Sequence, residues 1–154
     1  MSSTTARPPA SSVSDVRRSG VTWWQAALVG AGAATILNLA IWGVAVLAGA
    51  SLTLLDGGEE YLIELGSVAL MSAAPIVAGV ALVALISQWW SGVIRLAQVV
   101  GFVFAVGTIG SVLIYRADIG TTVALTLMHL VSGVVVVLAL EGLRRRGGVA
   151  HRSR

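Results

Sequence analysis

The chain contains no cysteine and no lysine, and few of its 154 residues carry a charge. The absence of cysteine excludes disulfide bonds, thiol redox chemistry and cysteine-bound metals. Charged residues make up 11% of the sequence, whereas soluble domains contain about 25%. Apolar residues make up 56%, and the mean hydropathy is +0.90. This composition excludes a disordered chain, disfavours a soluble globular enzyme and indicates an integral membrane protein.

Four stretches free of charged residues set the architecture, namely 19–55, 65–94, 96–115 and 119–140. A bilayer core of about 30 Å needs about 20 apolar residues per helix, so each stretch can cross once. Backbone in hydrocarbon must satisfy its own hydrogen bonds, which leaves helices or a closed barrel. Apolar runs such as 134–140 lack the alternation of barrel strands. The sequence therefore predicts an all-α membrane protein, an antiparallel bundle of four transmembrane helices over residues 25–49, 66–88, 94–115 and 121–140.

The ends of the chain differ from this domain. Residues 1–21 are rich in Ser, Thr and Pro, and we expect a disordered tail. Residues 22–143 form the transmembrane domain, and residues 144–154 form a basic tail. The apolar run over 23–47 is longer than the core of a cleaved signal peptide, which spans about 7–15 residues. We therefore expect it to be retained as the first helix.

The arginines predict the orientation. With four spans, both tails and the 89–95 connection lie on one side, and nine of the ten arginines fall there; Arg116 is the exception. The positive-inside rule then places both termini in the cytoplasm, with the protein in the plasma membrane. The cluster Arg144, Arg145 and Arg146 is expected to contact anionic lipids of the inner leaflet. Without interleaved aromatics or a folded module around them, these arginines do not indicate nucleic-acid binding.

The first outer loop is acidic, with Asp56, Glu59, Glu60 and Glu64. Its spacing does not match a calcium-binding loop, so we expect a solvated surface. Asp56 is followed by Gly57 and Gly58, which indicates a turn. Residues 61–65 are expected to begin the second helix outside the membrane.

Polar residues inside the spans are the candidate functional residues, because polar groups are costly in hydrocarbon. Counted from the outer ends of the predicted helices, they fall at similar depths and predict one polar layer in the outer half of the bundle. We expect His129 to face the interior, within reach of Asn38 or of the second helix, rather than lipid. The candidate cluster is Asn38, Ser72, Pro75, Thr108, Thr126 and His129.

Two interpretations of this layer stay open. In the first, its hydrogen bonds fix the packing of the helices. In the second, His129 binds a ligand or relays protons; ligation of haem would need a second histidine in the membrane. Small residues at 30 and 34, and at 97, 101 and 105, allow close helix packing or a dimer face.

The sequence assigns no catalytic residue, cofactor or metal ligand. We therefore expect a non-enzymatic membrane protein that acts as a structural or partner-binding subunit. Its partners would be the lipid bilayer and a second copy or another membrane protein. The alternatives are a transporter or channel component that uses the polar layer, and a haem- or quinone-associated oxidoreductase subunit.

Three short motifs carry a family resemblance: residues 38–42 in the first helix, Pro75 in the second, and residues 127–130 in the last. With them, residues 22–143 resemble an uncharacterised family of small four-span proteins typical of actinobacteria. The Arg-only, Ala/Gly/Val-rich composition is typical of such a source. The resemblance implies a four-span fold and assigns no activity.

Overall fold

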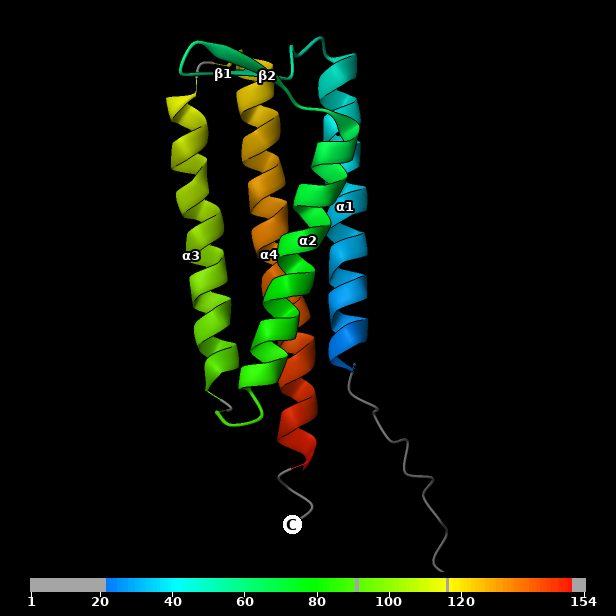
Figure 1. Ribbon diagram of the computed structural model, residues 1–154. Helices are drawn as coiled ribbons and strands as arrows, with labels where there is room; N and C mark the ends of the chain where they lie inside the picture. The colour runs from blue at the N-terminus through cyan, green and yellow to red at the C-terminus, as the bar shows by residue number, and fades with distance from the viewer. Residues whose placement is uncertain (1–21, 91, 116, 151–154) are drawn as a thin grey trace, which may run out of the picture.

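The computed structural model describes residues 22–90, 92–115 and 117–150, and over these the chain forms four helices and one β-hairpin (Figure 1). Helix α1 spans Trp23–Leu47, α2 Leu65–Ile86, α3 Val93–Ile114 and α4 Ile119–Ala150, and strands β1 (Thr53–Asp56) and β2 (Glu59–Leu62) lie between α1 and α2. All four helices are long and apolar enough to cross a membrane. The predicted all-α, four-helix membrane fold is confirmed. The predicted tail over residues 1–21 lies outside the described residues.

We call the two ends of the bundle the hairpin end, where β1 and β2 lie, and the arginine end, where α1 begins and α4 ends (Figure 1). All four helices begin within two residues of their predicted starts. Helix α4 begins at Ile119 and continues ten residues past the predicted end at 140. Glu141 accepts hydrogen bonds from Arg144 and Arg145, three and four residues later, and such pairs stabilise a helix beyond the membrane. Residues 151–154 lie outside the described part.

The expectation that residues 61–65 begin the second helix is wrong. Tyr61 and Leu62 belong to β2, which pairs antiparallel with β1, and α2 begins only at Leu65. Gly57 and Gly58 both have positive φ, 60° and 95°, as a two-residue turn of the type favoured in hairpins requires. The strand pairing satisfies backbone N–H and C=O groups of this segment.

The four helices do not all pack equally on one another. Helix α1 packs against both α2 and α4, and α3 packs mainly against α4, whereas α2 and α3 make little contact. Close approaches are made at glycines. A Cβ at Gly133 on α4 would lie 2.9 Å from the Cβ of Ala105 on α3, and one at Gly30 on α1 would lie 3.1 Å from Ala139. The small residues therefore serve contacts within the bundle.

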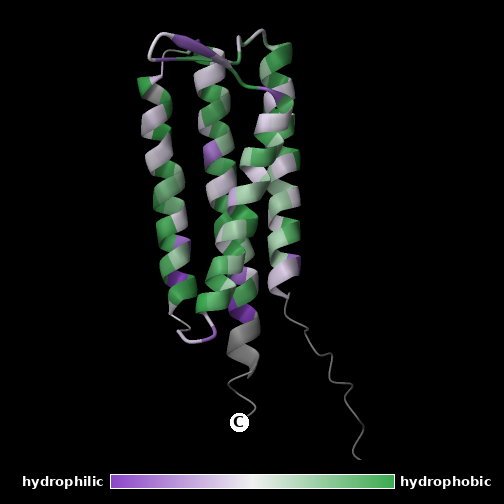
Figure 2. Ribbon diagram, viewed as in Figure 1, coloured by the Kyte–Doolittle hydropathy of each residue, from purple (hydrophilic) through white to green (hydrophobic). Residues whose placement is uncertain are grey.

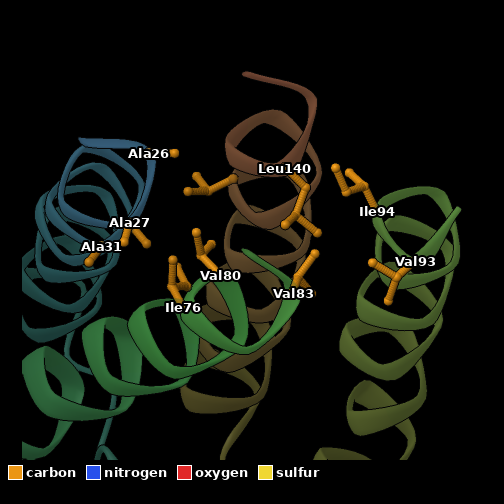
Figure 3. Packing of buried hydrophobic residues seen from close by; sticks show 11 residues of the cluster. Ala26, Ala27, Ala31, Ile76, Val80, Val83, Val93, Ile94 and Leu140 are labelled. Atoms are coloured by element: carbon orange, nitrogen blue, oxygen red, sulfur yellow. The ribbon is translucent and has the colours of Figure 1, made fainter. Parts of the chain in front are cut away.

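Two apolar clusters hold the bundle together. The cluster at the arginine end draws on all four helices, and Figure 3 shows Val93 and Ile94 of α3 directed towards Val83 of α2 and Leu140 of α4. The cluster at the hairpin end contains Ala45, Leu52, Val68, Ala124 and Met128, and none of its buried members comes from α3. Helices α2 and α3 therefore meet near the arginine end and separate towards the hairpin end.

Apolar side chains also cover the outside of the helices. Figure 2 shows hydrophobic residues along all four, with hydrophilic ones concentrated at the hairpin and at the arginine end. Leu28, Ile36, Leu70, Val103 and Leu138 are among the exposed large hydrophobic residues. An apolar outer surface of this extent suits lipid and is rare on soluble monomers.

Candidate functional site

Asn38 is the centre of the polar layer. This α1 side chain is buried, and its Nδ2 donates to Ser72 Oγ of α2 at 2.8 Å and to Ser132 Oγ of α4 at 3.0 Å. Ser72 gives its own proton to the carbonyl of Val68, at 2.7 Å, so its oxygen must accept from the amide. Asn38 thereby links three helices. Its Oδ1 is buried and has no hydrogen-bond partner among the described residues.

His129 lies on the same face of α4 as Ser132 and is half-buried. Its Nδ1 lies 2.8 Å from the carbonyl oxygen of Leu125, one turn earlier. A carbonyl only accepts, so Nδ1 carries the proton, and in the neutral ring Nε2 is then an acceptor. Nε2 makes no hydrogen bond to the described residues.

The other candidates divide into two groups. Thr108 on α3 donates to the carbonyl of Ala105 at 2.8 Å, and Pro75 lies within α2; both line the same cavity as Asn38 and His129. Thr126 donates to the carbonyl of Thr122, 2.8 Å away, and is not among the lining residues. Five of the six candidates therefore share one cavity.

This cavity, which we call the α2–α3 cavity, has a volume of about 620 Å³. Its walls are mainly apolar and come from α2, α3 and α4, with Asn38 contributed by α1. Met71 of α2 and Phe104 of α3 line it and are 68% and 71% exposed, so it opens sideways between these two helices. None of the residues that line it is Asp, Glu, Lys or Arg. Its polar lining residues are Asn38, Ser67, Ser72, Thr108, His129 and Ser132.

Sequence reasoning missed Ser132, although it lies three residues after His129 and so on the same helical face. It also missed the cavity itself. A gap between helices depends on how α2 is inclined relative to α3, which hydropathy does not encode.

A second polar cluster joins the hairpin end to α4. Asp118 precedes α4 and accepts from the backbone N–H of Thr121 at 3.0 Å, from the Thr121 hydroxyl at 2.9 Å and from Ser51 N–H at 3.1 Å. The Thr121 hydroxyl oxygen accepts from Leu52 N–H at 2.9 Å, which holds Leu52 at its left-handed φ of 50°. Hydrogen bonds from Thr121, and then from Ser51, hold the pKa of Asp118 below its ordinary value.

A third cluster ties α3 to α4 near the arginine end. Gln98 Nε2 donates to the carbonyl of Val137 at 3.2 Å and to Glu141 at 3.4 Å. Glu141 also pairs with Arg144 at 2.7 Å and with Arg145 at 3.0 Å. The side chain of Arg146 lies outside the described part. Among the described residues, no three or more His, Cys, Asp or Glu side chains gather as a metal site.

Four long apolar helices, a lipid-suited outer surface and polar groups confined to the interior and the ends define a multi-pass membrane protein. Residues 18–146 match the model of a family of unknown function, DUF6069, and the chain belongs to that family. No curated protein and no solved structure matches the chain.

Proposed function

We propose that this protein is a non-enzymatic plasma-membrane protein that binds an apolar partner molecule from the bilayer in the α2–α3 cavity. The observation that carries the proposal is the cavity itself, about 620 Å³ in volume and open to the side between two helices. Binding sites for small molecules occupy about 300–1,000 Å³ and combine apolar walls with a few fixed polar groups. This cavity has both properties.

An empty cavity of this kind is unfavourable, because the atoms that line it lack partners for dispersion contacts. Its sides are apolar and it faces the position of the lipid chains, so a molecule dissolved in the bilayer can enter without crossing water. The polar groups lie at the back, where Asn38 joins Ser72 and Ser132. A bound molecule would thus be held by apolar contacts and oriented by these groups.

The two alternative functions have less support. No lining residue is Asp, Glu, Lys or Arg, and the polar groups are outnumbered by apolar ones, whereas ion pathways are marked by paired charged residues. Haem held by two histidines needs a partner for His129, and His151 lies outside the described residues.

We also infer that the arginine end faces the cytoplasm, where the arginines attract anionic lipids. Arg95, Arg144 and Arg145 lie towards this end, and Glu141 offsets part of their charge.

Filling the cavity tests the proposal. Gly79 lines it, and a Cβ there meets nothing within 4 Å, so Gly79→Leu places a side chain in the space a ligand would use. Gly107 on α3 also has open space around it but lies outside the lining, so Gly107→Leu is the matched control. We expect neutral lipid recovered with the purified protein, measured by mass spectrometry, to fall only in Gly79→Leu. Equal recovery from both variants would contradict the proposal.

A further inference from the structure

We infer that the occupant of the α2–α3 cavity is a neutral lipid with a hydroxyl group, which is held at His129 and Ser132. This inference rests on the proposed function and narrows it to one chemical class. It is based on which polar groups in the lining can donate a hydrogen bond and which can only accept one, and on the depth of these groups in the bundle.

The depth of the polar lining groups excludes a lipid whose charged headgroup would lie beside them. His129 lies ten residues into α4 and Asn38 nine residues before the end of α1, and at 1.5 Å per residue both are about 14 Å from the hairpin end. A headgroup that carries charge would be costly at this depth without a counter-charge, and the lining provides none. The polar part of the occupant is therefore neutral and small.

The lining offers mainly acceptors. Ser72 and Thr108 give their protons to carbonyls of their own helices, so each oxygen has only lone pairs to offer. His129 likewise uses the Nδ1 proton within its helix, which leaves Nε2 as an acceptor. A matching ligand must supply a proton. An acyl chain, an ether or an ester cannot do so.

Ser132 adds one donor beside these acceptors. Its oxygen accepts from Asn38 at 3.0 Å, and its own proton has no acceptor among the described residues. Ser132 lies three residues after His129 and both line the cavity, so they present a donor and an acceptor side by side. A hydroxyl group, which both donates and accepts, fits this pair.

The test compares 4-dodecylphenol with 4-dodecylanisole, its methyl ether, which has the same apolar body and no proton to donate. The full chain in detergent micelles is titrated with each, and the apparent affinity is obtained from the rise in unfolding temperature. We expect the phenol to bind about five- to tenfold more tightly, which corresponds to one ordinary hydrogen bond. His129→Phe should lower this ratio to about one while still binding the anisole, which also shows that the variant is folded.

Ser132→Ala provides an independent check that does not alter the imidazole: it should weaken the binding of both probes, because the oxygen of each accepts the Ser132 proton, and leave the phenol-to-anisole ratio unchanged. Equal affinities of the two probes for the unmodified protein would overturn the hydroxyl assignment and leave the proposed function standing. Equal stabilisation of the unmodified protein and Gly79→Leu by both probes would overturn the cavity as the binding site, and the inference with it. A dimer that dissociates in Gly79→Leu but not in Gly107→Leu would assign the cavity to a second copy and would likewise overturn the inference.

Discussion

The indole Nε1 of Trp42 in α1 donates a hydrogen bond to the backbone carbonyl of Ile63, 2.9 Å away, just before α2 begins. This bond fixes the end of the hairpin connection against the first helix. In Trp42→Phe the carbonyl loses its donor in a part-buried position, which costs about 1–3 kcal/mol. We expect a decrease of this size in the free energy of unfolding, measured by titration with sodium dodecyl sulfate. Trp89→Phe is the control, because the Trp89 side chain is mostly exposed.

The contact of the hairpin end with α4 should weaken in acid. Hydrogen bonds from Thr121 and Ser51 lower the pKa of Asp118 in the folded protein. Their stabilisation is therefore complete above the ordinary pKa of an aspartate and is lost as the pH falls through the lowered value. Amide hydrogen exchange at Leu52 should become faster, relative to the intrinsic rate, over this range. Asp118→Asn should show fast exchange at neutral pH and no such pH dependence; an unchanged profile in that variant would exclude Asp118 as the titrating group.

Close packing of α3 on α4 should depend on Gly133. A Cβ there would lie 2.9 Å from the Cβ of Ala105, so Gly133→Val forces the two helices apart. Overpacking of this kind costs about 1–3 kcal/mol, and we expect a corresponding loss of unfolding free energy. Gly107→Val, with open space around it, should be nearly neutral. Equal losses in the two variants would point to a general effect of valine in these helices.

Orientation can be tested at both ends of the bundle. Because the chain has no cysteine, Glu60→Cys in β2 introduces a single thiol that can be labelled specifically. We expect a membrane-impermeant maleimide to label it in intact cells. Alkaline phosphatase fused after Arg154 should be inactive, because that end lies in the cytoplasm in the proposed orientation. An active fusion would overturn the arginine-inside arrangement.

The four helices could be predicted from the sequence because they depend on local composition, namely where charged residues stop and long apolar runs begin. Asn38 and Ser72 were predicted to lie together, and they are hydrogen-bonded. The hairpin was missed because its strands have only four residues each, although Gly57 and Gly58 signalled its turn. The partnership of Asn38 with Ser132 and the cavity depend on helix inclination, which no single segment encodes.

The order of helix contacts bears on how the protein is assembled during synthesis. Helices α1 and α2 pack as one sequential pair, α3 and α4 as another, and the pairs meet chiefly where α1 contacts α4. Each pair can enter the bilayer as it leaves the ribosome, before the other exists. The first helix must then remain available until the last is complete, because α1 and α4 close the bundle only at that point. The α2–α3 cavity lies along the seam between the two pairs, so its walls are brought together only when α4 has packed on α1.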